Sequence, residues 1–251
     1  IADPHEPYGN QEVYKQCLNH KDAGICIVTG DLGDYYSKSR FAKSRHQEFK
    51  EELTSVFKRM EWLSFNFKTV KIMIGNHDNR PEKKIQSLLA DHPDLLIMTE
   101  QNLLEYMSLF FDNIEIVGIQ INLLGISEMH TKSISHIYQH GDIIFTHAEK
   151  SSANHDLLMT NISKYLRNWS EFLGLKPYRF IVQAHNHSEM RKCAGAERWF
   201  LTPTASYPKS IGFEYILHPK MYGNPPVVGY SIFHQYNGKT KYNESYNWII
   251  E

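Results

Sequence analysis

Five short apolar segments, each followed at once by polar residues of the kind that bind metals, constrain the fold of this chain most. The segments are residues 1–2, 25–29, 70–74, 143–146 and 180–183. Most of them are rich in β-branched residues and all are bounded by turn-forming residues, which is typical of buried strands. Ligands of open α/β sheets bind at the carboxyl ends of the strands. We therefore expect the five polar clusters to converge on one site.

Helical patterns separate several of these predicted strands. Asn10 is a suitable N-cap for a helix that continues to His20, and from Phe49 onwards apolar residues recur every three or four positions. Shorter helices are expected over residues 82–90, 101–111 and 157–172. The alternation of strands and helices predicts an α/β fold.

The C-terminal part has a different pattern, because prolines interrupt it repeatedly. Residues 227–233 are predicted to form a strand, and Asn237-Gly238 marks a hairpin turn before a second strand over residues 240–246. There is no internal repeat or linker. We predict a single domain over residues 1–251, with a helical excursion around residues 37–67 and a β-rich part that begins near residue 198.

Composition excludes two classes of protein. With 41% hydrophobic residues the chain has ample material for a core, which excludes a disordered protein. Its apolar runs are shorter than a membrane helix needs, and a net charge of −1 does not indicate an extended nucleic-acid surface. Three widely spaced cysteines form no disulfide framework, so we expect a reducing, cytoplasmic location. No leader is visible, and because the chain starts without Met we expect a few residues to precede Ile1.

The polar clusters gain their meaning from being found together. Taken singly, a Gly-Asp pair is usually a turn, and a single histidine is usually structural. Five such clusters at five successive predicted strand ends are hard to attribute to chance. Carboxylate, imidazole and amide ligands suit divalent manganese, iron or zinc. The clusters are Asp3-x-His5, Gly30-Asp31-x-x-Asp34, Gly75-Asn76-His77-Asp78, His147 and His185-x-His187.

This ordered set resembles the signature of the calcineurin-like metallophosphoesterase superfamily. The resemblance covers the chain from Asp3 to His187, with Thr146 and Ala184 in place of two glycines that precede ligand positions. It implies an α/β fold in which two mixed β-sheets are sandwiched between helices. It also implies two divalent metal ions, for which manganese is expected and iron, zinc or nickel are alternatives.

Carried over position by position, the resemblance assigns roles to individual residues. Asp31 would bridge the two metal ions, and a metal-bridging hydroxide would attack phosphorus in line. His77 would stabilise or protonate the leaving group, Asp34 would orient His77, and Asp78 is expected to tie down its own turn. The ligands would be Asp3, His5, Asp31 and His187 at one metal, and Asp31, Asn76, His147 and His185 at the other.

Features outside the signature bear on the substrate. Tyr35 stands where phosphoprotein phosphatases of the superfamily carry arginine, which weakens a protein-phosphatase interpretation. Tyr35 and Arg80 are candidate substrate contacts, although Arg80 could equally be a solvent-facing loop residue. Two further groups could guide or stack on nucleic acid, or could simply be a solvated helix face and core packing. They are the basic residues Lys38, Arg40, Lys43 and Arg45, and the tyrosines Tyr207, Tyr215, Tyr222 and Tyr230.

The sequence thus predicts a phosphoesterase that acts on phosphodiesters or nucleotide-like phosphomonoesters. The expected partner is a phosphate-ester substrate such as a nucleotide or nucleic acid, without a membrane partner, in a bacterial or phage-like protein. Two alternatives stay open: a serine/threonine-type protein phosphatase, and a non-catalytic scaffold that retains the fold. The oligomeric state and the native substrate are left open.

Overall fold

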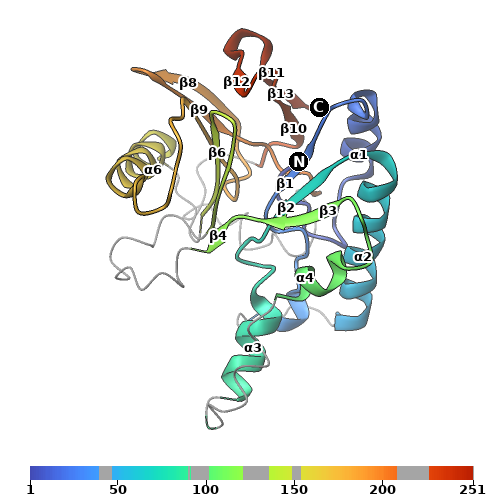
Figure 1. Ribbon diagram of the computed structural model, residues 1–251. Helices are drawn as coiled ribbons and strands as arrows, with labels where there is room; N and C mark the ends of the chain where they lie inside the picture. The colour runs from blue at the N-terminus through green and yellow to red at the C-terminus, as the bar shows by residue number, and fades with distance from the viewer. Residues whose placement is uncertain are drawn as a thin grey trace.

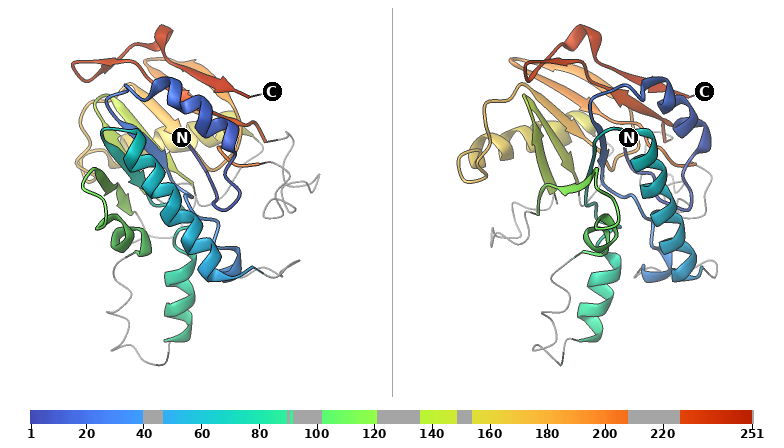
Figure 2. Two further views of the ribbon diagram at one scale, coloured as in Figure 1. Left: turned by 90° about the vertical axis from the view of Figure 1, so that its right-hand side faces the viewer. Right: turned by 45° about the vertical axis from the view of Figure 1, so that its right-hand side comes forward.

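Two β-sheets lie face to face in the computed structural model, and helices cover their outer faces (Figures 1 and 2). The chain therefore has the predicted α/β architecture. The structure describes residues 1–39, 47–89, 91, 102–120, 136–148, 154–207 and 226–250. None of the helices in these ranges combines the length and apolarity needed to cross a bilayer.

The predicted helices are present, with ends shifted by a few residues. The Asn10 side chain accepts a hydrogen bond from the Glu12 amide at 2.9 Å, which confirms the predicted N-cap. The long amphipathic pattern forms α2, whose buried face carries Val56, Met60 and Leu63. The helices are α1 (Gln11–Cys17), α2 (Phe49–Asn66), α3 (Arg80–Leu88), α4 (Leu103–Ser108) and α6 (His155–Trp169), with 3-10 turns at Leu18–His20, Tyr36–Lys38 and Tyr242–Glu244.

The first sheet is parallel, in the order β1-β2-β3. Its strands are β1 (Cys26–Thr29), β2 (Val70–Met73) and β3 (Ile114–Val117), so two of the predicted strands are confirmed. The predicted strand at residues 1–2 is not a strand in the structure. The segment nevertheless lies alongside β1, because the Thr29 amide donates a hydrogen bond to the Ile1 carbonyl at 2.9 Å.

The second sheet is mixed, in the order β4-β5-β6-β7-β9-β8. The chain passes into it from β3 through Gly118 alone, whose φ of +112° is open to glycine and costly for other residues. Two predicted strands are confirmed here as β6 and β7, which pair in parallel. The strands are β4 (Ile119–Gln120), β5 (His136–His140), β6 (Ile143–His147), β7 (Phe180–Gln183), β8 (Met190–Ala194) and β9 (Glu197–Leu201).

The C-terminal strands differ from the prediction. Asn237-Gly238 does form a turn, with both residues at positive φ, but it joins only the short strands β11 (Gln235–Tyr236) and β12 (Lys239–Thr240). The predicted strand over residues 240–246 is wrong, because Tyr242 turns in against Phe200, with ring centroids 5.9 Å apart, in a 3-10 turn. Strand β10 (Gly229–Ile232) pairs instead with β13 (Tyr246–Ile249).

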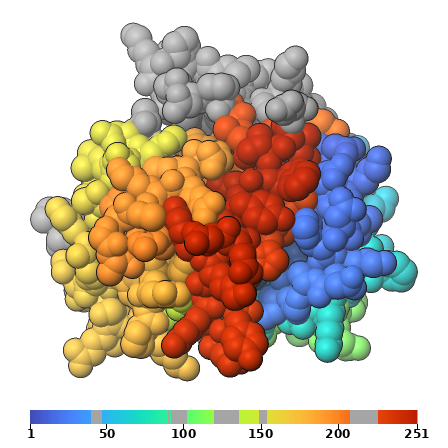
Figure 3. All heavy atoms as spheres, turned by 90° about the horizontal axis from the view of Figure 1, so that it is seen from above, coloured from blue at the N-terminus to red at the C-terminus, as the bar shows by residue number. Residues whose placement is uncertain are grey.

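The hydrophobic core follows the layers. One cluster lies between α1, α2 and the first sheet, a second between α6 and the second sheet, and a third between the two sheets. Met73 of β2, Phe145 of β6 and Phe200 of β9 belong to the third cluster. Seen from above, the C-terminal segment covers the junction between the N-terminal segment and the strands of the second sheet (Figure 3).

Candidate metal centre

The predicted ligands come together where strands of both sheets end. Asp31 follows β1, Asn76 and His77 follow β2, His147 ends β6, and His185 follows β7. The segment that carries Asp3 and His5 is held beside the end of β1, because the His5 amide donates to the Asp31 carbonyl at 2.9 Å. Because β6 and β7 pair in parallel, the residues that follow them also emerge at one edge.

Three triads of ligand atoms occupy this region, and one of them joins His5, Asp31 and His77. The other two have no residue in common. In the first of these two, Asp3, His5 and His187 place one ligand atom each within 4.8 Å of one another. In the second, Asp31, His147 and His185 do the same. These triads correspond to the two predicted centres. Their side chains range from fully buried to slightly exposed, which suits a cation held inside the protein.

Asp31 lies between the triads. Its Oδ2 is 3.3 Å from His147 Nε2, 3.8 Å from His5 Nε2 and 3.9 Å from His185 Nδ1. Its other carboxylate oxygen accepts the His77 amide at 2.8 Å and is held in place. Asn76 joins the second triad, since its Oδ1 lies 3.0 Å from His147 Nε2. A carboxylate with one oxygen restrained and the other aimed at both triads has the geometry required of a bridge.

Several atoms at the centre of this cluster lack hydrogen bonds. In the described part of the chain, Asp3 Oδ1, Asp31 Oδ2 and His185 Nδ1 are buried and accept or donate none. A buried polar atom without a partner is costly, and buried carboxylates are normally paired or coordinate metals. The unsatisfied atoms, together with an oxygen and nitrogen donor set, fit a pair of divalent cations.

The charges support the same conclusion. Burial would raise the pKa of Asp31, but the charge of the neighbouring His147 holds it well below its usual range, so the carboxylate is ionised. Burial would lower the pKa of His147, but Asp31 and Asp3 raise it to about 9. The cluster thus places positive charge where a cation would bind, and a metal must displace a proton from His147.

The backbone of the site is strained. Among the described residues, seven that are not glycine have positive φ, and five of these are predicted ligands. Such backbone conformations cost free energy and persist where the surrounding structure enforces them, often at functional sites. The five are Asp3 (47°), His5 (50°), Asp31 (51°), His185 (79°) and His187 (50°).

Two glycines allow the strand ends to approach this closely. A Cβ at Gly75 would overlap the Asp31 carboxylate, and one at Gly30 would overlap the His147 ring. Thr146 and Ala184 stand at the two positions where the signature described above has glycine. Both residues are buried, and neither displaces a predicted ligand. Thr146 Oγ1 donates to the Val182 carbonyl at 3.2 Å, so its hydroxyl is satisfied within the sheet.

His77 lies beside the cluster in a chain of three polar residues. Its Nδ1 is 2.8 Å from Asp34 Oδ1, and its Nε2 is 2.9 Å from Arg80 Nη2. Because a guanidinium can only donate, Nε2 is the acceptor and Nδ1 carries the proton given to Asp34. Burial and the Arg80 charge lower the pKa of His77 to about 4, so the ring is neutral in this state.

Asp34 and Asp78 have separate tasks. Burial opposes ionisation of Asp34, but hydrogen bonds from His5 and His77 and the charge of Arg80 hold its pKa well below the usual range.

The Asp78 carboxylate accepts hydrogen bonds from the amides of Gly75 at 2.8 Å, Gly33 at 2.9 Å and Leu32 at 3.2 Å. It therefore ties together the loops after β1 and β2, in line with its predicted structural role.

The remaining candidates are placed as follows. Tyr35 is fully buried and packs on Phe49, with ring centroids 6.0 Å apart, so we assign it to the core rather than to a substrate contact. Lys38 Nζ lies 4.4 Å above the same Phe49 ring.

Tyr230 is buried and stacks on Trp248, which leaves no face for a base, whereas Tyr207 is exposed. Arg40, Lys43, Arg45, Tyr215 and Tyr222 lie outside the described residues.

Sequence reasoning missed His136. It is buried, and neither of its ring nitrogens has a hydrogen-bond partner in the described structure. It lies directly opposite His147 in the β5–β6 pair. A signal existed, because the two-residue connection at Gly141 and Asp142 sets the hairpin register that places these residues opposite each other.

Comparisons with known proteins add a likeness to solved structures. No family model matches the chain, and no curated protein matches it. Vps29 from Cryptosporidium parvum is 15% identical with a TM-score of 0.42, covering 100% of this chain and 95% of that one. Vps29 from Entamoeba histolytica, solved in complex with zinc, is 11% identical with a TM-score of 0.44, covering 99% and 96%.

Proposed function

We propose that this chain is a binuclear metallophosphoesterase of the calcineurin-like superfamily. One observation carries the proposal: seven ligand-type side chains from five separate segments converge on two neighbouring triads, and Asp31 Oδ2 lies within 4 Å of a histidine nitrogen of each. The strained backbone at five of these residues and the unsatisfied buried oxygens support it. A purely structural cluster would not need to maintain either feature.

The residues present fit two divalent cations. Asp3, His5, Asp31 and His187 would hold one, and Asp31, Asn76, His147 and His185 the other. Bound at these positions, two divalent ions lower the pKa of water and neutralise phosphoryl oxygens. Asn76 supplies an amide in place of a further carboxylate, so the occupied site keeps a net positive charge that attracts a phosphate ester. We propose that both cations are manganese ions.

His77, Asp34 and Arg80 form the leaving-group side of the proposed site. Asp34 orients the His77 ring through the 2.8 Å contact to Nδ1. Arg80 caps Nε2 at 2.9 Å and also donates to the Asp34 carbonyl at 2.7 Å. An incoming phosphate would compete with Nε2 for the guanidinium. Drawing Arg80 onto the substrate exposes Nε2 and removes a charge that lowers the pKa of His77, which lets the ring hold a proton for the departing oxygen.

The substrate class follows from the groups beside the metal ligands. Arg80 provides one guanidinium next to His77, while the position after Asp34 contributes only the buried Tyr35 ring. A single arginine suits a simple phosphodiester or a nucleotide-like monoester. A phosphoprotein would need further contacts that hold its peptide, and we do not propose it.

A metal titration combined with a substrate panel tests the proposal. Purified protein is freed of metal, reconstituted with Mn²⁺, and assayed on an aryl phosphodiester, an aryl phosphomonoester, cyclic nucleotides, short DNA and a phosphopeptide. We expect about two metals per chain and hydrolysis of a diester or monoester that a chelator abolishes. The Asp31→Asn variant is the matched control. Activity confined to the phosphopeptide would favour a protein phosphatase, and two bound metals without any hydrolysis would favour a scaffold.

A further inference from the structure

His136 is a buried histidine to which the proposed metal chemistry gives no task. It is 2% exposed, and among the described residues neither of its ring nitrogens has a hydrogen-bond partner. Burying a polar group without a hydrogen bond costs free energy, and an apolar side chain at this position would avoid that cost. A buried imidazole with both nitrogens unsatisfied therefore points to a bound water, ion or ligand as the missing partner.

The side chain of His136 lies on the face of the second sheet that meets the first sheet. Side chains alternate along a strand, and in β5 Ile137 packs toward α6 whereas Tyr138 packs against the core between the sheets. His136 therefore shares the face of Tyr138. In β6, His147 shares a face with Phe145, which belongs to the same interlayer core. Both histidines thus project into the layer between the sheets, at the end where the predicted ligands gather.

The two histidines are also close in space. His136 begins β5 and stands directly opposite His147, and residues in such positions of an antiparallel pair have Cβ atoms about 4.5–5.5 Å apart. Burial and the positive charge of His147 lower the pKa of His136 to about 3, so its ring is neutral. A neutral imidazole has one donor and one acceptor nitrogen. His136 thus brings a hydrogen-bond donor to the triad of Asp31, His147 and His185.

His136 is nevertheless not placed as a metal ligand. It belongs to none of the groups of three ligand atoms that lie within 4.8 Å of one another in the described structure. His77 lies beside the triad of Asp3, His5 and His187, because its ring packs edge-on against the His5 ring with centroids 4.5 Å apart. His77 and His136 therefore accompany different triads, and a group bound against both triads has a histidine on each side.

We propose that His136 is a substrate-binding residue, whose ring donates a hydrogen bond to a phosphoryl oxygen of the ester. The inference rests on the proposed function, because that function supplies the phosphate. The face shared with His147, the burial and the two unsatisfied nitrogens carry it. A phosphoryl oxygen is a strong, negatively charged acceptor, and it would be the partner that no described residue provides.

Replacement of His136 by leucine tests the proposal, with inorganic phosphate as the probe. Leucine is close to histidine in volume and removes both nitrogens, whereas His136→Gln keeps an N–H donor. The proteins are loaded with Mn²⁺, analysed for metal content and titrated with phosphate by calorimetry. We expect unchanged metal content in both variants. The phosphate Kd should rise about tenfold or more in His136→Leu and should stay within about threefold of the unmodified value in His136→Gln.

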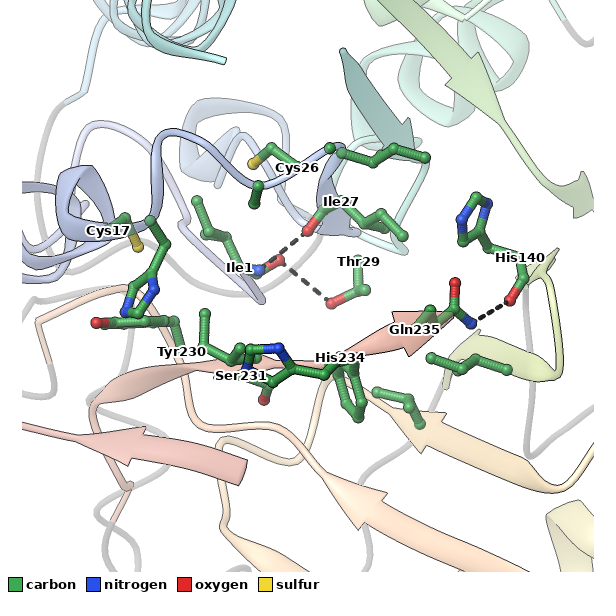
Figure 4. A pocket seen from close by; sticks show the side chains of 18 of the residues that line it. Ile1, Cys17, Cys26, Ile27, Thr29, His140, Tyr230, Ser231, His234 and Gln235 are labelled. Carbon is green, nitrogen blue, oxygen red and sulfur yellow. Dashed lines mark hydrogen bonds between the residues drawn. The ribbon is translucent and has the colours of Figure 1, made fainter. Parts of the chain in front are cut away.

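His140 provides the matched control on the same face of the same strand. It is the last residue of β5, where it lines a groove of about 740 Å³ beside β1 and β10 (Figure 4). The Gln235 side-chain nitrogen donates to the His140 carbonyl at 3.2 Å, and His140→Leu retains this backbone acceptor. His140→Leu should leave the phosphate Kd unchanged, which separates the role of His136 from a general effect of leucine in β5.

A measurement on the unmodified chain does not depend on how the variants fold. With isotope-labelled histidine and with Zn²⁺ in place of the paramagnetic Mn²⁺, phosphate should shift a ring-nitrogen NMR resonance that is missing from His136→Gln. A His136 resonance that phosphate leaves in place would overturn the proposal.

The variants have outcomes that would overturn it as well. Phosphate binding by His136→Leu as tight as that of His140→Leu, with only Tm changed, would make His136 a structural residue. Loss of metal from His136→Leu would make it a ligand. An unmodified protein that binds neither metal nor phosphate would overturn the proposed function along with this inference, so the two failures are distinguishable.

Discussion

At the scale of single residues, Asp31 and His77 differ sharply although they are neighbours in space. The Asp31 carboxylate faces both triads, so its proposed task is to hold metal. The His77 side chain contacts Asp34 and Arg80 more closely than Asp31, whose Oδ2 lies 3.9 Å from His77 Nε2, and the His77 backbone amide donates to Asp31 Oδ1 at 2.8 Å. Variants at the two positions should therefore separate metal binding from chemistry.

We predict that Asp31→Asn is more damaging to metal content than loss of a ligand to one metal. Removing the shared carboxylate weakens both sites, whereas His5→Ala or His147→Ala weakens mainly one. Elemental analysis after reconstitution should give clearly less metal for Asp31→Asn than for either histidine variant. A His5→Ala protein with lower metal content than Asp31→Asn would disprove the bridging role.

His77→Ala should keep its metals and its fold yet lose turnover by roughly 10²–10⁴. The alanine variant retains the amide that donates to Asp31, so the bridge stays oriented. The loss should be greatest for poor leaving groups, which need the proton most. Asp34→Asn should show a weaker form of the same pattern, and the double variant should be non-additive. Additive losses, or an emptied metal site in His77→Ala, would argue against the pair.

Metal affinity should rise with pH. Because Asp31 and Asp3 raise the pKa of His147 to about 9, this ring is protonated at neutral pH and must lose its proton to become a ligand. One released proton changes the apparent affinity about tenfold per pH unit below that pKa. Between pH 6.5 and 8.5 Kd should fall about 100-fold, measured by calorimetric titration. The release of protons can be checked by repeating the titration in buffers of different ionisation enthalpy. A Kd that does not change with pH would contradict the stated protonation of His147.

At the scale of elements, α2 is tied to the metal-centre segment by a buried ion pair that the sequence pattern did not reveal. Arg59 Nε lies 2.6 Å from Glu6 Oε1, and the Tyr14 hydroxyl donates to the same oxygen at 3.0 Å. The guanidinium also lies 3.3 Å from the centroid of the Tyr14 ring. Because Glu6 follows His5, this contact anchors a predicted ligand to a helix of the outer layer.

We predict that Arg59→Ala lowers the free energy of unfolding by about 3–5 kcal/mol, because it leaves a buried carboxylate without its positively charged partner. The double variant Glu6→Gln/Arg59→Met removes both charges and should recover part of this loss. Urea unfolding measures both quantities. Lys241→Ala, which breaks an exposed pair with Glu244, is the matched control and should cost about 1 kcal/mol or less. An Arg59→Ala loss as small as the control's would show that the buried pair is not stabilising.

At the scale of the whole molecule, the candidate centre lies where strands of the two sheets end beside each other. Ligands follow strands of both sheets, and an interlayer core of Met73, Phe145 and Phe200 packs between these sheets. A bound cation would therefore connect the sheets directly. Its binding free energy would add to the stability of the whole fold.

Metal should consequently stabilise the folded chain. At a free metal concentration 100 times Kd, one site contributes about 2.7 kcal/mol to the free energy of unfolding. For a chain of this size that corresponds to a rise in Tm of about 5–10 °C. Differential scanning calorimetry with Mn²⁺ and then with chelator measures the change, and Mg²⁺ at the same concentration controls for ionic strength. An unchanged Tm in saturating Mn²⁺ would exclude binding that is specific to the folded state.

The sequence by itself determined the local features. β-Branched runs ended by glycine and polar residues predicted β1, β2, β6 and β7, because strand formation and termination depend on nearby side chains. A helical period from Phe49 predicted α2 in the same way, and Asn10 predicted the start of α1. The order of the polar clusters predicted the candidate ligands. Both the residue type of a ligand and its position directly after a strand can be identified from the sequence alone.

Tertiary structure decided what depends on contacts between distant segments. His136 opposite His147, Glu6 paired with Arg59 and the burial of Tyr35 each arise from packing between elements, which no local pattern specifies. The split of the predicted strand at residues 240–246 has the same cause, since Tyr242 packs on Phe200. Hydrophobic periodicity indicates which face of an element is buried but not which partner buries it, so pairing partners, buried charges and the groove beside β1 became visible only in the folded chain.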